Sequence, residues 1–288
     1  MAIAVGIPPA AEQSAIASFL DRETVKIDAL VDEQKRLIEL LKEKRQAVIS
    51  HAVTKGLDPN APMKDSGVEW LGQVPEHWDV KPLKHLVRFK SGGTPAKDNL
   101  AFWDGSIPWA SAKDLKAETI YDTVDHITEA AIASSATDLV PEKSVLVLVR
   151  GMTLAHSFPV VLAGRPMAIN QDLKALTSQA DVQSEFLAWL LRGAARESLS
   201  RVDEAGHGTK ALRMDAWTSL RLSVPPSTEQ LAIASFLSQE TAKIDALIER
   251  AREAISLLGE RRSALISAAV TGKIDVRGVT TEIAEAAA

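Results

Sequence analysis

Two stretches of the chain, residues 7–58 and 224–275, share one pattern of apolar and polar positions, and more than half of their aligned residues are identical. In each copy apolar residues recur at heptad spacing, which is typical of a long helix with an apolar stripe. Such a stripe must be covered, and the other copy is the simplest cover. We therefore expect two long helices that form a coiled-coil rod. The residues expected to be buried in its seam are Leu30, Leu41, Leu247 and Leu258.

Both copies have helix boundary signals at matching places. Each begins with a Pro-Pro pair, which suits the approach to a helix, and each ends at a glycine, Gly56 or Gly272. In the second copy Ser227 and Gln230 have the spacing of a capping box. An uninterrupted helix between these marks would be roughly 65 Å long at about 1.5 Å per residue. Because the intervening residues join the end of one helix to the start of the other, we expect the pair to be antiparallel.

The residues between the two copies show a different pattern, in which short apolar runs alternate with Gly- and Pro-containing turns. The expected strands are residues 80–89, 145–149, 159–162 and 171–176, and residues 182–196 are expected to form an amphipathic helix. The pattern predicts an α+β fold, with one globular mixed α/β domain that contains a curved sheet. The expected domains are a first long helix at residues 1–65, the globular domain at 66–223, and a second long helix with a tail at 224–288.

Composition narrows the class of protein. The formal net charge of the 288 residues is −5, whereas a non-specific nucleic-acid binder is usually basic, so DNA binding would need a local basic surface or a partner's charge. The chain has no cysteine, which is consistent with a reducing cytoplasm. No apolar run approaches the roughly 20 residues of a membrane span, and the first residues do not resemble a signal peptide. We therefore expect a cytoplasmic protein with no membrane partner.

Motifs for catalysis are weak or missing. The sequence contains no P-loop, no Gly-x-Gly-x-x-Gly and no His-Glu-x-x-His, and its six histidines lack ligand spacing, so no metal site is expected. The stretch from Asp172 to Lys174 resembles half of a nuclease core, but such cores need further carboxylates to hold Mg²⁺. A stand-alone endonuclease that uses Asp172 and Lys174 remains an alternative. The preferred interpretation has no catalytic residue.

Polar loops of the middle region are the best candidates for contact with DNA. Lysine and arginine suit phosphates, hydroxyls and free backbone amides can add hydrogen bonds, and the amides of Asn170 and Gln171 can read adenine edges. The candidate contacts are Lys90, Ser91, Gly92, Thr94, Arg150, Thr153, Asn170, Gln171, Thr209, Lys210 and Arg213. A solvated turn is the simpler explanation for any one of them. An internal hydrogen-bonded pair that closes a strand end is the alternative for Gln171 and Asp172.

With these features in place, the chain resembles the specificity subunit of type I restriction–modification systems. The resemblance rests on the repeated Pro-Pro-x-x-Glu-Gln-x-x-Ile-x-x-Phe-Leu at residues 8–20 and 225–237, and on the Glu-Thr-x-Lys-Ile-Asp that follows it in both copies. The opening SGVEWLGQVPEHW at residues 66–78 and the Ile-Asn-Gln-Asp at 169–172 are similar to parts of a target recognition domain. The similarity covers essentially the whole chain.

This resemblance implies a non-catalytic protein. Specificity subunits of the family hold two target recognition domains apart on two antiparallel helices, and each domain reads one half of a bipartite DNA site. Methyltransferase subunits dock on the helices and supply S-adenosylmethionine chemistry, while restriction subunits supply ATP-driven translocation and cleavage with Mg. The expected partners are therefore double-stranded DNA, the methyltransferase subunits and the restriction subunit. No cofactor is expected in this chain itself.

The chain departs from the family pattern because it has one recognition domain where a usual member has two. Association of two chains would supply the second half-site reader, so we expect a second copy as a partner. A truncated product, or use with another specificity chain, is also compatible with the sequence. A coiled-coil scaffold or adaptor that binds protein rather than DNA is a further alternative, which the acidic balance favours.

Two phenylalanines lie beside the heptad positions rather than in them. Phe19 and Phe236 occupy equivalent places in the two copies. We expect them to contact the methyltransferase subunits, with packing on the recognition domain as the alternative.

Overall fold

The computed structural model describes residues 6–135, 137–179, 181–204 and 208–276. The chain divides into two compact units, which are treated separately below. The helical unit comprises Met1–Arg45 and Thr241–Ala288, and the globular unit comprises Gln46–Glu240. The globular unit thus includes the last part of the first long helix and the first part of the second.

The two repeated segments form the long helices α1 (Ala10–Lys55) and α6 (Ser227–Val270). Both end as the glycines predict, since Gly56 and Gly272 have φ angles of +78° and +71°, which suit glycine. The predicted capping box is wrong. The Pro226 carbonyl accepts the first helical hydrogen bonds of α6, and the Gln230 side chain donates instead to the carbonyl oxygens of Asp181 and Pro225.

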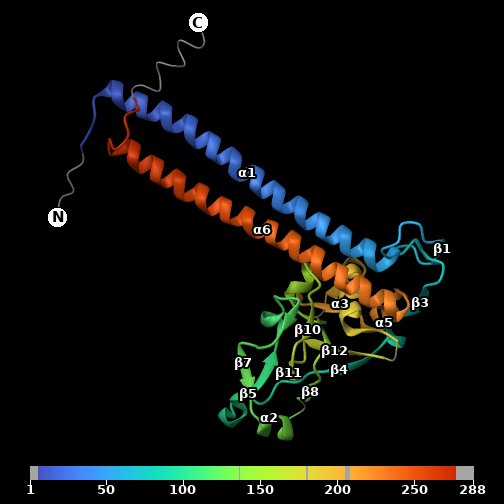
Figure 1. The fold of residues 1–288 in the computed structure, drawn as a ribbon. Coiled ribbons are helices and arrows are strands. Elements are labelled where there is room, and N and C mark those ends of the chain that lie inside the picture. Colours follow the sequence, from blue (N-terminus) through green and yellow to red (C-terminus); the bar gives the residue numbers. More distant parts are fainter. Residues whose placement is uncertain (1–5, 136, 180, 205–207, 277–288) are drawn as a thin grey trace. The chain divides into compact units, whose positions relative to one another are not determined.

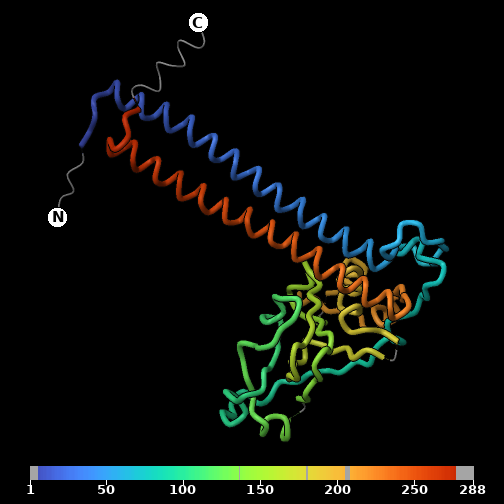
Figure 2. Tube along the Cα trace, viewed as in Figure 1, coloured from blue at the N-terminus to red at the C-terminus, as the bar shows by residue number. Residues whose placement is uncertain are grey.

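Within the helical unit, α1 and α6 run antiparallel, as predicted (Figures 1 and 2). Arg45 pairs with Asp245 at 2.9 Å, and Arg262 pairs with Asp28 at 3.2 Å. Residue numbers therefore rise along one helix in the direction in which they fall along the other. Apolar side chains fill the space between them. This cluster consists of Ile38, Leu41, Ile244, Ile248 and Ala251, with Ile255 packed against it.

The predicted seam is half wrong. Leu41 is buried and Leu258 is half-buried, but Leu30 and Leu247 are 44% and 45% exposed. One of the two heptad rows of the seam, the row expected to contain Leu30 and Leu247, lies one residue later in the sequence. The buried row includes Ile38, Ile248 and Ile255. The two apolar positions of a heptad are separated alternately by three and by four residues. In this sequence apolar side chains occur at both of the positions that the second row could take. Contact with the partner helix selects one of them.

The globular unit contains an open five-stranded sheet of order β4-β12-β9-β10-β6 and an open four-stranded sheet of order β7-β5-β11-β8. The strands of the first sheet are β4 (Val87–Ser91), β12 (Leu173–Ser178), β9 (Val145–Leu148), β10 (Val160–Ala163) and β6 (Thr119–Ile120). Those of the second are β7 (Asp125–Ile127), β5 (Trp103–Ala110), β11 (Met167–Ile169) and β8 (Leu139–Val140). The predicted mixed α/β architecture is confirmed.

Smaller elements complete this unit. Three two-stranded pairs are β1 (Met63–Asp65) with β2 (Gln73–Pro75), β3 (Asp79–Pro82) with β15 (Arg221–Val224), and β13 (Val202–Glu204) with β14 (Lys210–Leu212). The short helices are α2 (Glu129–Ser134), α3 (Ser184–Gly193), α4 (Ala195–Leu199) and α5 (Met214–Thr218). The strand expected at 80–89 is two strands separated by a 3-10 turn, Leu83–His85, and the helix expected at 182–196 is divided between α3 and α4.

The core of the globular unit lies between the five-stranded sheet and its helices. Strand β9 is fully buried, as its continuous apolar run predicts, and α3 covers it with Phe186, Leu187 and Leu190. Residues from both repeats join the same core, including Val53 from α1 and Leu237 from α6. Among the described residues no helix is both long and apolar enough to cross a membrane.

Candidate nucleic-acid interface

The ends of three neighbouring strands bring most of the predicted contact residues together. Strand β12 lies between β4 and β9, and its register places Lys174 opposite Ser91 and Leu173 opposite Leu148. The segments that follow β4 and β9 and precede β12 therefore meet at one edge of the sheet. We call this set of segments, residues 90–95, 149–153 and 169–174, the strand-end surface.

Gln171 and Thr94 are joined across this surface. The Thr94 hydroxyl donates a hydrogen bond to Oε1 of Gln171, whose side chain is exposed. Among the described residues no hydrogen bond from the Gln171 amide NH₂ is found, and the residue is exposed. This arrangement suits Gln171 for hydrogen bonding to a base, because one end of its amide is already oriented.

Asp172 does not pair with Gln171 as the alternative interpretation expected. Its Oδ1 accepts a hydrogen bond from Arg150 Nε at 2.7 Å, and its carbonyl accepts from the amides of Val149 and Arg150. Asn170 is buried, and its Oδ1 accepts from the Asp172 amide at 3.1 Å. Asn170 therefore shapes this turn, and its Oδ1 is already occupied by the backbone.

The loop that contains Thr94 is held closely against β11. A Cβ added to Gly92 would lie 2.0 Å from the Ile169 carbonyl oxygen, so this position requires glycine. The Gly93 amide, which was expected to be free, donates to that same oxygen at 2.9 Å. Two tryptophan indoles also hold the loop, since Trp109 donates to the Gly93 carbonyl and Trp103 to the Ala96 carbonyl. No signal in the sequence marks these tryptophans as supports of the site.

The β13–β14 pair borders the strand-end surface. Arg150 forms a bridge with Ala211, and the Gly151 amide donates to the Lys210 carbonyl at 2.9 Å. Thr209 is half-buried, and Thr153 is exposed on the 3-10 turn Met152–Ala155. Of the turn predicted at residues 206–209, Gly206 and His207 lie outside the described part of the chain.

The cations of this region are mostly paired with acids. Lys90 lies 3.2 Å from Asp138, Arg150 2.7 Å from Asp172, Lys210 3.0 Å from Glu204, and Arg213 3.2 Å from Asp203. Lys174, the lysine of the nuclease alternative, donates instead to the Ser91 hydroxyl. The surface is therefore a mixture of both signs rather than a basic patch, in keeping with the acidic balance of the chain.

The structure offers no support for the nuclease alternative. In the described part of the chain, no group of three or more His, Cys, Asp or Glu side chains is placed to hold a metal ion. Asp172 is engaged by Arg150, and Lys174 by Ser91.

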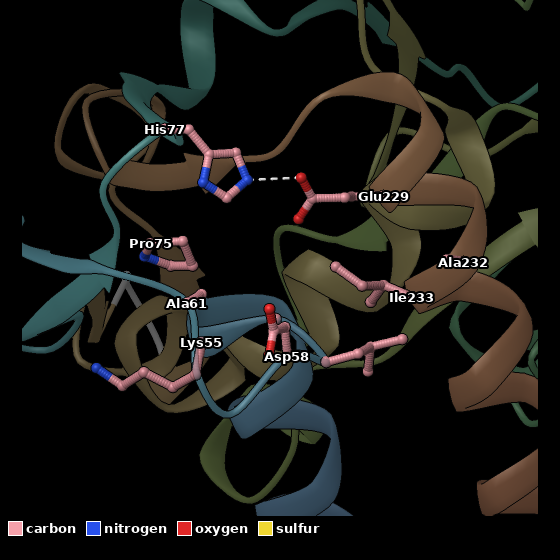
Figure 3. A pocket seen from close by; sticks show the side chains of 10 residues that line it. Lys55, Asp58, Ala61, Pro75, His77, Glu229, Ala232 and Ile233 are labelled. Carbon is pink, nitrogen blue, oxygen red and sulfur yellow. Dashed lines mark hydrogen bonds and ion pairs between the residues drawn. The ribbon is translucent and has the colours of Figure 1, made fainter.

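A separate cavity of about 230 Å³ lies within the globular unit, between the end of α1 and the start of α6 (Figure 3). Leu57, Pro75 and Ile233 contribute to its apolar lining. At its edge the Glu229 carboxylate contacts Nε2 of His77 at 2.6 Å and accepts from the Trp78 indole at 3.0 Å. These bonds join the segment before β3 to the first turn of α6, which is a structural role.

The two phenylalanines predicted to bind partners have different surroundings. Phe19 is half-buried in the helical unit, with the Arg22 guanidinium 5.7 Å from its ring centroid. Phe236 belongs to the globular unit and is 38% exposed. Neither is enclosed in a core, so both remain available for contact.

Comparison with curated proteins shows relatives of one kind. The chain is 29% identical over 177 residues to the EcoR124I/EcoR124II specificity subunit of Escherichia coli, which covers 61% of this chain and 41% of that protein. It is 24% identical over 277 residues to a putative MjaX specificity subunit of Methanocaldococcus jannaschii, covering 95% of this chain and 60% of the relative. The chain thus spans about half the length of these two relatives.

Solved structures show the same fold. A chain from a structure of a type I R-M system complex matches with a TM-score of 0.71 and 16% identity, over 92% of this chain and 60% of the other. The HsdS subunit from Thermoanaerobacter tengcongensis matches with a TM-score of 0.54 and 15% identity, over 94% of this chain and 60% of the other. Residues 75–257 match the family described as type I restriction modification DNA specificity domain, and the chain therefore belongs to this family.

Proposed function

We propose that this chain is the DNA-recognition subunit of a type I restriction–modification complex. It reads one half of a bipartite site and directs methyltransferase and restriction subunits to it, without catalysis of its own. The observation that supports this most is the strand-end surface of a chain that belongs to the specificity family. Three loops from distant parts of the sequence present Thr94, Gln171 and Arg150 together at one sheet edge.

The residues of this surface suit recognition of DNA, and catalysis is assigned to the partner subunits. The surface has amides and hydroxyls, which suit recognition of base edges and hydrogen bonding to phosphate oxygens. S-adenosylmethionine, ATP and Mg would act in the partner subunits. If the chain is only a scaffold, it should not make the activity of any partner subunit specific for a DNA sequence.

Methylation mapping tests this function directly. Host DNA is compared with and without the chain, in cells that contain its methyltransferase partner. We expect adenine methylation at one interrupted sequence only when the chain is present. Methylation that is unchanged by deletion of the chain would contradict the proposal and favour the scaffold.

Gln171 is proposed as a base contact of the strand-end surface. The Gln171→Ala change should cost about 1–3 kcal/mol of binding free energy on the site found by methylation mapping and little on random duplexes. Binding titrations on both duplexes measure this difference. Gln73→Ala is a matched control, because it removes the same exposed amide from β2, outside the strand-end surface. An equal loss on both duplexes would remove Gln171 from base recognition.

A second copy is proposed as the source of the other half-site reader. The globular unit buries Gln230, Ile233 and Leu237 from the start of the second repeat. The equivalent residues of the first repeat, Gln13, Ile16 and Leu20, are exposed or half-buried in the helical unit. The helical unit therefore carries the same residue types in less buried positions.

The end of α6 supports the same proposal. Val53 of the first repeat is fully buried in the globular core, whereas its equivalent Val270 is 58% exposed. A globular unit from a second copy would cover both sets of uncovered residues and produce a symmetric pair of readers. Light scattering on the purified chain tests this, and we expect the mass of a dimer. A monomer at all concentrations would favour use with another specificity chain.

We also propose that the methyltransferase docks near the start of each repeat. On α6, Phe236 and Leu231 are exposed, and Leu231 lines a groove of about 460 Å³ together with Leu162, Trp189 and Ala234. Combined Phe19→Asp and Phe236→Asp changes should reduce co-purification with the methyltransferase while the chain keeps its melting temperature. Unchanged co-purification would place the contact elsewhere.

A further inference from the structure

We propose that Lys174 is a phosphate-binding cation of the strand-end surface and that Ser91 positions it. This inference rests on the proposed DNA-recognition function and names a contact that its candidate residues did not include. Four features support it, namely the register, the pairing of the neighbouring cations, the chemistry of the Ser91 hydroxyl, and the adjacent Thr94–Gln171 contact.

The register gives Lys174 a rigid base. It lies on β12, the strand between β4 and β9, with Ser91 opposite on one side and Val147 opposite on the other. Its neighbours along the strand, Leu173 and Ala175, are fully buried. Lys174 is half-buried, so its stem is supported by the sheet while part of the residue reaches solvent.

The pairing of charges distinguishes Lys174 from the other cations of the region. Lys90, Arg150, Lys210 and Arg213 each have a carboxylate within 3.2 Å. No ion pair between Lys174 and a carboxylate is found among the described residues, and its ammonium donates to the neutral Ser91 hydroxyl. A cation that is paired with an acid offers little net charge to a phosphate, because the acid repels the same phosphate from nearby. The ammonium of Lys174 keeps its full charge for DNA.

Ser91 adds to this site in two ways. Its oxygen accepts one hydrogen bond from the ammonium, which leaves two N–H donors of Lys174 for other acceptors. The Ser91 hydroxyl hydrogen is then free to turn toward a phosphate oxygen, since that oxygen already accepts from the lysine. Lysine ammonium groups and serine hydroxyls both donate hydrogen bonds to phosphate oxygens.

Lys174 also lies close to the proposed base contact. Lys174 and Gln171 belong to the segment that enters β12, while their partners Ser91 and Thr94 belong to the segment that leaves β4. A phosphate held by Lys174 and Ser91 would thus set the position of the DNA backbone beside Gln171. The purely structural alternative is that Lys174 only links β12 to β4, and the two roles differ in their dependence on salt.

The test measures DNA binding by the full chain in complex with its methyltransferase subunits. Dissociation constants are determined by fluorescence anisotropy over a series of KCl concentrations, on the site found by methylation mapping and on a random duplex. For Lys174→Met we expect the slope of log K against log salt to fall by about one counterion on both duplexes. The affinity for both duplexes should fall by the same factor. Lys174→Arg should keep the wild-type slope.

Lys210→Met is the matched control, because Lys210 lies on the bordering β14 but is paired with Glu204. Its slope should change by clearly less than that of Lys174→Met. An unchanged slope in Lys174→Met, or an equal loss in Lys210→Met, would overturn the inference. Ser91→Ala should lower affinity less than Lys174→Met, and a variant indistinguishable from wild type would remove Ser91 from the site. If the wild-type complex itself prefers no sequence, the proposed function fails instead, so the two failures are distinguishable.

Discussion

The two copies of the repeated segment have the same local structure and different surroundings. Gln13 and Gln230 are equivalent, and each donates to the carbonyl oxygen of the first proline of its own Pro-Pro pair at 2.8 Å. Thr54 and Thr271 each donate to a serine carbonyl one turn earlier at 2.7 Å. Gln230, however, also bonds Asp181 and Gln183 and is fully buried, whereas Gln13 is exposed. Near-identical sequence therefore determines the helix and its local bonds, but it does not determine which face is covered.

The first and largest test compares equivalent valines at the ends of the two helices. Val53→Asp should destabilise the globular unit by roughly 4 kcal/mol or more, because it places an unpaired charge in a fully buried position. Val270→Asp should leave the unfolding of the monomer nearly unchanged, because Val270 is 58% exposed. Urea denaturation followed by circular dichroism measures both. Equal destabilisation of the two variants would show that the copies are not in different environments.

The same pair of variants sharpens the dimer proposal. Val270→Asp should weaken self-association, since the proposed second copy would cover this residue. Light scattering across a dilution series measures the change. A dimer that is as stable as wild type would exclude this end of α6 from the contact.

The second test examines the seam of the helical unit with two adjacent residues. Ile38→Asp should destabilise that unit by about 3 kcal/mol, because Ile38 packs against Ile248 and its neighbours. Leu37→Asp is the control, since Leu37 is 42% exposed, and its cost should be within about 0.5 kcal/mol. Thermal melts followed by circular dichroism at 222 nm would show which of the two residues faces the partner helix. A larger effect for Leu37 would support the seam that the sequence predicted.

The third test uses the two equivalent glutamines. Gln230→Ala should cost about 1–3 kcal/mol, because the half-buried Gln183 amide and the carbonyls of Asp181 and Pro225 lose a partner. Gln13→Ala loses one exposed hydrogen bond and should cost at most about 0.5 kcal/mol. Denaturant midpoints would measure the difference. Equal midpoints would mean that the tertiary bonds of Gln230 add nothing to stability.

The smallest effect is expected at Glu229, which binds His77 and Trp78, compared with its equivalent Glu12 on α1. Glu229→Gln keeps the size of the side chain but weakens the hydrogen bonds to both partners, so we expect a loss of about 1 kcal/mol. Glu12→Gln should change the free energy of unfolding by only about 0.3 kcal/mol, because Glu12 interacts with the helix dipole at the first turn of α1. Denaturation of both variants at pH 7 is the measurement, and a larger loss for Glu12 would contradict this ranking.

The sequence determined the helices, their ends and their antiparallel pairing, because these depend on signals within one turn and on connectivity. It also identified the loops that form the strand-end surface, from the turn residues that follow apolar runs. It did not determine which of two heptad rows is covered, since Leu30, Leu37 and Ile38 are all apolar and only the partner helix distinguishes them.

Only the tertiary structure decided how the loop residues are used. Ser91 and Lys174 are distant in sequence, and the order β4-β12-β9 makes them neighbours. The same order buries Asn170, pairs Arg150 with Asp172 and leaves Lys174 beside a neutral hydroxyl. The physical reason is that helix signals act between residues three or four apart, whereas strand neighbours are selected by packing of the whole sheet.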